Sequence, residues 1–311
     1  MKPFSGLSAD AFAAYAPEKW SSNVHNLARM RVKDAVIGLC ERVQVALAAE
    51  LADLERAASD EMPNLANQKK VDAQWVFWFR DAAARSALGT FLEHIKLDQS
   101  ALLNIAPQDK HAAVAVVLRQ GQLWVGLYLG AGATVDRRNV VAKLQKSWER
   151  ERLLDVLKTL PVGGQVGVIG KLQDVTEATL AQLEEQAAAL DQSDEPWQLG
   201  YALEPAGVTA AGEGLVSQVA DRVRALVPVY RFVAWTRDND HIEAQKQLQE
   251  EKKEKRRQAA HFNEGDKVRI MTGLFAGKTG VVMETDTKAQ VKVRVGKMSV
   301  VVAGTELTAA A

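Results

Sequence analysis

The chain has few of the features that cross-link a protein or anchor it in a membrane. Its 311 residues include a single cysteine, Cys40, so no internal disulfide framework can form. No apolar run approaches the roughly eighteen residues that span a bilayer, and the N-terminal stretch lacks the basic start and apolar run of a signal peptide. Lysine and arginine number 39, as do aspartate and glutamate, so no global charge draws the chain to a polyanion. These absences predict a cytoplasmic protein with no membrane segment.

Catalytic and metal-binding motifs are also lacking. The sequence has no G-x-x-x-x-G-K-[ST], H-E-x-x-H, C-x-x-C or calcium-loop pattern. The most suggestive cluster is T-R-D-N-D-H at 236–241, but capping of the charged segment that follows explains its two aspartates without a metal. Asp136 likewise fits the cap of a helix, with Arg137 and Arg138 exposed in a solvated turn. We therefore predict no catalytic residue, no metal and no cofactor.

The composition and the first third of the chain indicate a multidomain α+β protein. Apolar residues make up 47% and charged residues 25%, which is ordinary for globular protein, and the length allows two or three domains. Residues 1–68 are predicted to be a helical region. Apolar residues recur at three- and four-residue steps from Val32 to Leu54, which favours a long helix within residues 8–60 that ends before Pro63.

Residues 69–240 are predicted to form an α+β domain on a mixed or antiparallel sheet. The stretch 111–130 has apolar residues on two arms around Gln120-Gly121, the pattern of a hairpin. The other elements expected here are strands at 75–79, 166–169, 197–203 and 229–235, and helices at 84–98, 139–160, 211–226 and one opening at Asp174 or Thr176. Short strands alternating with helices support the α+β assignment.

Residues 241–260 form a charged linker that is predicted to be a solvated helix or a flexible tether. Only Leu248 is large and apolar in the segment 243–260, so it cannot bury a face. Residues 241–311 carry 13 basic and 9 acidic side chains, whereas residues 71–240 carry 17 and 21. Any contact with a polyanion is therefore expected at the C-terminal end, where Arg256 and Arg257 of the linker could meet phosphates.

Residues 261–311 read as a small unit of short strands separated by Gly or Asp. The spacing G-D-x-V-x-I-x-x-G-x-x-x-G-x-x-G-x-V, from Gly265 to Val281, resembles the KOW motif of NusG-type transcription elongation factors and of several ribosomal proteins. The resemblance implies an SH3-like β-barrel that binds RNA, the ribosome or a protein partner such as the RNA polymerase machinery. One departure is clear: NusG-type domains carry an aromatic after the V-x-V strand, where this chain has Val295-Gly296-Lys297.

The expected binding residues lie on the first strand and the loops of this unit. Leu274 and Phe275 are predicted to be exposed at the tip of a long loop beside Lys278, where an aromatic could stack on a base and a lysine could meet a phosphate. An equally good interpretation makes Phe275 a core plug of the barrel. The other cations assigned to this surface are Lys267, Arg269 and Lys297 of the barrel and Arg256 and Arg257 of the linker.

These patterns favour a non-catalytic interaction protein that the KOW-like barrel recruits to nucleic acid, the ribosome or the transcription machinery. One alternative is an enzyme, a nuclease or other hydrolase, whose α+β domain acts on a substrate that the barrel delivers, with Asp136 and Asp238 as residues to test. The other alternative is an adaptor that binds only proteins.

Overall fold

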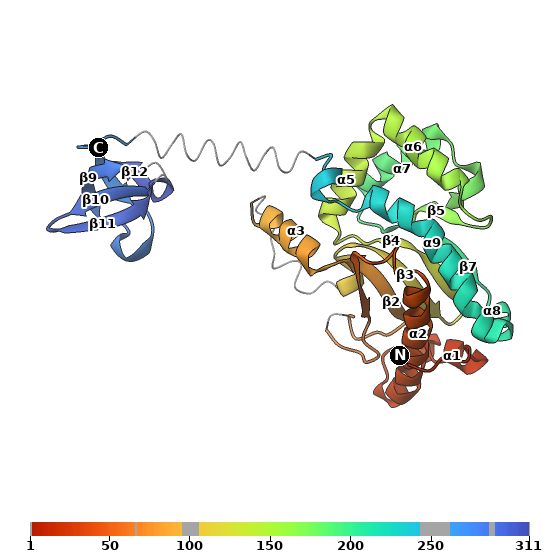
Figure 1. The fold of residues 1–311 in the computed structure, drawn as a ribbon. Coiled ribbons are helices and arrows are strands. Elements are labelled where there is room, and N and C mark those ends of the chain that lie inside the picture. Colours follow the sequence, from red (N-terminus) through yellow and green to blue (C-terminus); the bar gives the residue numbers. More distant parts are fainter. Residues whose placement is uncertain (1, 66, 95–105, 243–261, 286–289, 311) are drawn as a thin grey trace. The chain divides into compact units, whose positions relative to one another are not determined.

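The chain forms two compact units. The computed structural model describes residues 2–65, 67–94, 106–242, 262–285 and 290–310 (Figure 1). The first unit, called the body below, is Met1–Ile242, and the second, called the barrel unit, is Glu243–Ala311. Each has its own buried apolar residues. No helix among the described residues has the length and apolar character to cross a membrane.

A seven-stranded antiparallel sheet organises the body, in the order β1-β2-β3-β4-β7-β5-β6. Its strands are β1 (Leu54–Ala58), β2 (Ala73–Arg80), β3 (Ala112–Arg119), β4 (Gln122–Leu129), β5 (Gln165–Val168), β6 (Gln173–Asp174) and β7 (Trp197–Leu203). The predicted hairpin is confirmed, since Arg119 pairs with Gln122 across the turn. Of the two predicted kinds of sheet, the antiparallel one is correct.

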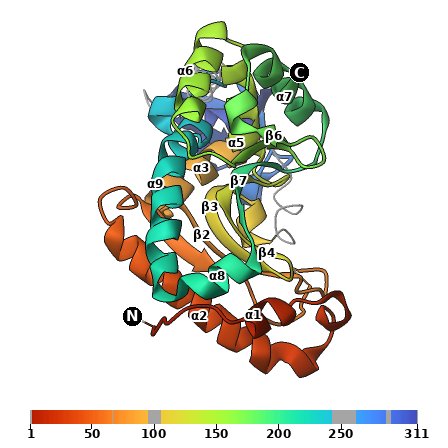
Figure 2. The same ribbon diagram turned by 90° about the vertical axis from the view of Figure 1, so that its right-hand side faces the viewer.

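Helices cover the sheet and extend beyond its β6 side. They are α1 (Ala9–Ala13), α2 (Asn26–Ala46), α3 (Ala82–His94), α5 (Thr134–Leu144), α6 (Ser147–Lys158), α7 (Leu180–Gln192), α8 (Pro205–Ala211) and α9 (Leu215–Val233). Short 3₁₀ turns are η1 (Pro17–Lys19), η2 (Asn23–His25), η3 (Pro107–Asp109), η4 (Val175–Glu177), η5 (Gly212–Gly214) and η6 (Arg237–Asn239). Figure 2 shows α9 running along the sheet, with α5, α6 and α7 grouped at one end.

The central strands β2, β3 and β4 are buried on both faces, which explains why they are apolar at nearly every position. All eight residues of β2 are buried. Val76 and Trp78 belong to the large cluster that includes α2 and α9, whereas Trp75 and Phe77 belong to a second, aromatic cluster. Successive side chains of a strand point to opposite faces, so a continuous apolar run is what a strand covered on both sides requires.

Two helix and strand predictions in the body are wrong. The helix expected within residues 8–60 is replaced by α1, two 3₁₀ turns and α2, and residues 54–58 form β1, which pairs with β2. The strand expected at 229–235 is the last part of α9, which continues through Pro228. In both places tertiary contacts override local preference: Leu54 gains a strand partner, and Tyr230 is buried on the apolar face of α9.

Two other boundaries are shifted. The helix expected at 139–160 is two helices, α5 and α6, which together begin and end close to the predicted limits. The helix expected to open at Asp174 or Thr176 begins at Leu180 instead. Thr179 caps it, and a reciprocal bond from Gln182 completes a capping box. Asp174 instead caps the turn η4 just before it.

The barrel unit is a curled five-stranded antiparallel sheet, in the order β11-β10-β9-β8-β12. Its strands are β8 (Lys267–Ile270), β9 (Thr279–Thr285), β10 (Gln290–Val295), β11 (Met298–Ala303) and β12 (Leu307–Ala309), with turns η7 (Gly273–Phe275) and η8 (Gly304–Glu306). Its core contains Val268, Ile270, Val282, Val291, Val293, Val302 and Leu307. The curled sheet agrees with the SH3-like barrel that the resemblance implies.

Candidate nucleic-acid interface

Two strands of the barrel unit present cations on the face opposite the core. In β8, Val268 and Ile270 are buried while Lys267 and Arg269 are exposed. In β10, the valines at 291 and 293 are buried while Lys292 and Arg294 are exposed. Strict alternation sends every second side chain outward, so these four cations share the outer face of the sheet.

Strand register determines how the four cations are arranged on this face. Lys267 lies opposite Val281 of β9, and Val281 lies opposite Arg294 of β10. Two neighbouring strands are about 4.8 Å apart, so β8 and β10 are separated by about 10 Å along the sheet. Within each strand the two cations are two residues apart, or about 7 Å. Lys267 and Arg294 are therefore level with each other across β9, with Lys292 toward one end of the sheet and Arg269 toward the other, and we call these four side chains the outer cation group.

These cations have no internal ionic partner among the described residues. None of Lys267, Arg269, Lys292 and Arg294 forms an ion pair or side-chain hydrogen bond with a described residue. Glu284 lies opposite Lys292 in the register, yet the two make no ion pair. Binding of a ligand to these cations would therefore break no ion pair with any described residue.

The loop residues expected to bind are placed differently from one another. Leu274 is fully exposed in η7, whereas Phe275 is half-buried and packs against the barrel core. Lys278 and Lys297 are exposed, the latter after Gly296, whose φ of +63° suits a tight turn. Arg256 and Arg257 of the linker lie outside the described residues. The position of Phe275 favours the core-plug interpretation over the stacking one.

Lys292 and Arg294 were absent from the residues that we assigned from sequence. The signal that would have found them is the alternation V-K-V-R-V at 291–295, which repeats the K-V-R-I pattern of β8. Their proximity to Lys267 depends on the pairing of β8, β9 and β10, which sequence alone does not specify.

The comparisons with known proteins agree with this location. A family model of the KOW motif matches residues 264–296, a range that includes β8, β9 and β10. No curated protein matches the chain. The barrel unit therefore carries a KOW motif, a module associated with RNA and ribosomes.

Of the two acids named for the enzyme alternative, Asp238 lies in the turn η6 and Asp136 has a structural role. Asp136 is almost fully buried in α5 and does not cap it: its carboxylate accepts the backbone N–H groups of Ala112 and Trp235 and pairs with Arg80. Arg137, which we expected to be exposed, is buried and donates to the backbone carbonyl group of Leu190 in the last turn of α7 and to those of two residues after it, Ser193 and Glu195. No group of three His, Cys, Asp or Glu among the described residues could hold a metal ion.

His241 belongs to a polar cluster that fastens the chain after α9. Its Nε2 lies 3.5 Å from Oε1 of Glu149, and its backbone N–H donates to Oδ1 of Asn139 at 2.8 Å. Lys143 donates to the carbonyl oxygen of Phe232 at 3.0 Å, and burial lowers the pKa of Lys143 to about 8. Because Lys143 and Glu149 are almost completely closed off from solvent, this cluster fixes the end of the body rather than presenting a site to a substrate.

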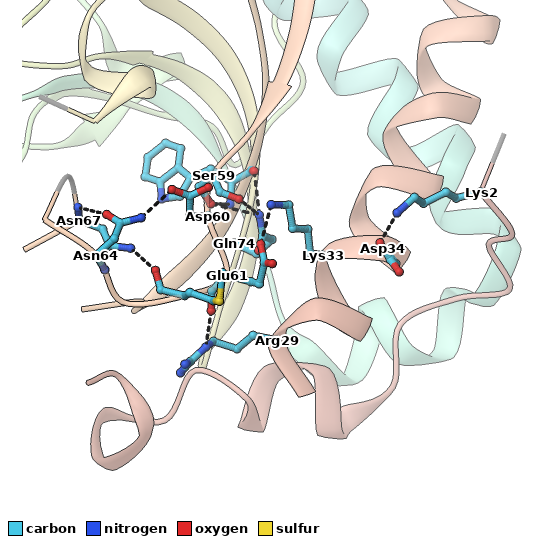
Figure 3. Close-up of polar contacts among 12 residues, drawn as sticks. Lys2, Arg29, Lys33, Asp34, Ser59, Asp60, Glu61, Asn64, Asn67 and Gln74 are labelled. Carbon is cyan, nitrogen blue, oxygen red and sulfur yellow. Dashed lines mark hydrogen bonds and ion pairs between the residues drawn. The ribbon is translucent and has the colours of Figure 1, made fainter. Parts of the chain in front are cut away.

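The connection between β1 and β2 borders a cavity of about 80 Å³. Figure 3 shows the polar contacts made by this connection. Asn64 and Asn67 each accept the other's backbone N–H, at 2.7 and 3.0 Å, and Asn64 donates to Asp60 at 2.6 Å. Arg29 of α2 donates to the carbonyl of Glu61 at 2.8 Å. These bonds hold the connection in one shape, and most of its polar groups are engaged within it.

Proposed function

We propose that the barrel unit binds RNA through its outer cation group and thereby recruits the body to RNA or to a ribosome. The observation that carries the proposal is the set of four outward cations without ionic partners among the described residues, located on the strands of a KOW motif. Phosphate contacts supply most of the non-specific affinity of a protein for nucleic acid. Attachment to the barrel raises the concentration of the body near the bound RNA.

The test is an RNA titration of the full chain with a charge-matched control. One variant carries Lys267→Gln, Arg269→Gln, Lys292→Gln and Arg294→Gln. The control replaces four exposed body cations whose side chains form no ion pair or hydrogen bond with other described residues, namely Arg31, Arg138, Lys158 and Lys171, also by Gln. Both variants have four fewer positive charges than the wild type, so only the location differs.

We expect the barrel variant to bind at least tenfold more weakly and the control to bind like the wild type. The slope of log K against log salt should become shallower by about 0.7–0.9 for each phosphate that the variant no longer neutralises, as counterion release requires. Equal weakening in both variants would show that the outer cation group is not the binding surface.

A protein partner is the second candidate, because the barrel unit also exposes apolar side chains. Leu274 is fully exposed, and Met271 is 57% exposed on the same loop. An exposed apolar pair beside cations can anchor a protein contact. Under this function, Leu274→Asp would abolish copurification of partners that survives nuclease treatment, while the four-cation variant would retain it. Transcription-related recruitment would appear as RNA polymerase subunits among those partners.

A further inference from the structure

We infer that the barrel unit recognises the sugar–phosphate surface of double-stranded, A-form RNA rather than the bases of a single strand. This inference rests on the proposed binding of RNA and specifies its substrate class. Three properties of the barrel unit support it: the location of its phenylalanines, the fixed backbone of the strands that carry the cations, and the hydroxyl groups beside those cations.

Among the described residues of the barrel unit, no phenylalanine, tyrosine or tryptophan ring is fully exposed for a base to stack on. Residues 262–311 contain two aromatic side chains, Phe262 and Phe275. Both are half-buried and pack against the barrel core. Aromatic stacking contributes about 1–3 kcal/mol per base when proteins bind single strands. A single strand on this face would therefore have to be ordered without the stacking that normally compensates for its reduced freedom.

The outer cation group is held on paired strands, and it therefore suits a partner that is already rigid. Lys267 and Arg269 belong to β8, which pairs with both β9 and β12, while Lys292 and Arg294 belong to β10, which pairs with both β9 and β11. Their Cα positions are fixed by hydrogen bonding on both sides. A double helix presents phosphates at fixed positions and gives up little conformational entropy on binding.

Hydroxyl side chains alternate with the cations on the same face. Arg294 lies opposite Ser299 of β11, and Arg269 lies between Thr279 of β9 and Thr308 of β12. All three hydroxyl residues are exposed. Directly opposed residues have Cβ atoms about 4.5–5.5 Å apart, so each arginine has a hydroxyl group beside it. Hydroxyl groups bind phosphate oxygens and, in RNA, the 2′-OH of the ribose.

Together these groups match the wide, shallow minor groove of A-form RNA. That groove displays 2′-hydroxyl groups flanked by phosphates, and it is recognised by shape and by sugar–phosphate contacts rather than by base sequence. The outer face supplies cations for the phosphates and hydroxyl groups for the riboses, and the two phenylalanines described in the barrel unit pack against its core instead of lying on this face. Glu284, which lies opposite Lys292, places a negative charge on this face.

The experiment titrates the full chain with three nucleic acids of the same base sequence. They are a 16-base-pair RNA duplex, one of its strands alone with a sequence that does not pair with itself, and the equivalent DNA duplex. We expect the RNA duplex to bind at least tenfold more tightly than either of the others at the same salt concentration. Changing the base sequence of the duplex should alter the affinity less than twofold.

A hydroxyl variant tests the ribose contacts separately from charge. Thr279→Val, Ser299→Ala and Thr308→Val together should reduce the preference for RNA duplex over DNA duplex to less than threefold and leave the salt slope unchanged. The control, Ser21→Ala with Thr209→Val and Ser217→Ala, replaces exposed hydroxyl residues of the body and should keep the preference.

The outcomes separate this inference from the function on which it rests. Tighter binding of the single strand, or equal binding of RNA and DNA duplexes, would overturn the inference and leave RNA binding intact. Failure of all RNA ligands to bind would overturn the proposed function as well. A strong dependence on duplex sequence would show that bases are read directly and would also overturn the inference.

Discussion

The guanidinium group of Arg80 pairs with the carboxylate of Asp136 inside the body, and both side chains are almost completely buried. Arg80 comes from the end of β2 and Asp136 from α5, so the pair connects the sheet to the helical end of the body. Arg80 also donates to the carbonyl of Trp235 at 3.1 Å, and Asp136 accepts the N–H of the same residue at 2.7 Å. The pair therefore also holds the chain directly after α9.

Asp136→Asn is expected to destabilise the body by about 3–5 kcal/mol, because it leaves the Arg80 charge buried without a counter-charge. Its amide group would also face backbone N–H groups that need an acceptor. Urea unfolding followed by tryptophan fluorescence measures the destabilisation. The control is Asp238→Asn, which replaces an aspartate in the turn η6. It should change the free energy of unfolding by less than about 0.5 kcal/mol. A similar destabilisation in both variants would contradict a role for the buried pair.

A side chain at position 200, where β7 has a glycine, is expected to destabilise the body. A Cβ atom there would lie 2.6 Å from ring atoms of Trp124 and 2.8 Å from the Cα of Gly126, which is its partner on β4. Gly200→Ala should therefore cost about 1–3 kcal/mol through overpacking. Gly89→Ala in α3, where a Cβ meets nothing within 4 Å, is the control and should be neutral or stabilising. Unchanged stability of Gly200→Ala would mean that the indole of Trp124 moves freely.

His111 is expected to make the body sensitive to acid. Its ring stacks on Phe79 with centroids 5.8 Å apart, and burial, aided by the nearby charge of Arg80, lowers its pKa to about 4. The unfolded chain takes up this proton near pH 6.5, so the folded state binds fewer protons between pH 6.5 and 4. The contribution of the neutral His111 ring to the free energy of unfolding is therefore fully present above pH 6.5 and is lost as the pH falls from 6.5 to 4.

His111→Phe keeps the stacked ring and removes the titration. Between pH 6.5 and 4, the free energy of unfolding of the wild type should fall by about 3 kcal/mol more than that of this variant. Urea unfolding at each pH measures both values. Parallel stability curves for the two proteins would show that His111 is protonated in the folded state at the same pH as in the unfolded chain.

Local patterns were predictable from sequence, and pairings between distant segments were not. The hairpin around Gln120-Gly121 and the motif beginning at Gly265 depend on neighbouring residues, and both predictions are confirmed. The residues around Tyr230 are β-branched and aromatic, which is typical of a strand, yet the helical face of α9 packs on the sheet. The outer cation group similarly requires the register of three strands, so sequence located β8 but missed Lys292 and Arg294.

Gly280 is expected to be essential for the folding of the barrel unit and to have no effect on the stability of the body. Its position in β9 is so crowded that a Cβ atom would lie 2.5 Å from Val293 and 2.6 Å from the carbonyl oxygen of Arg294. That oxygen belongs to the backbone of β10, which cannot move away without breaking the pairing that aligns the outer cation group. Gly280→Ala should therefore unfold or severely loosen the barrel unit and reduce RNA affinity at least tenfold.

The distribution of tryptophan makes this prediction easy to check. The seven tryptophans all lie at or before residue 235, so their fluorescence reports on the body alone. The Gly280→Ala protein should keep the wild-type urea midpoint by fluorescence while the barrel resonances collapse in a backbone amide NMR spectrum. Gly207→Ala, at an open position in α8, should leave both signals and RNA binding unchanged. A shift of the fluorescence midpoint in Gly280→Ala would show that the two units do not fold independently, because a change confined to the β9–β10 pairing would then have reached the core of the body.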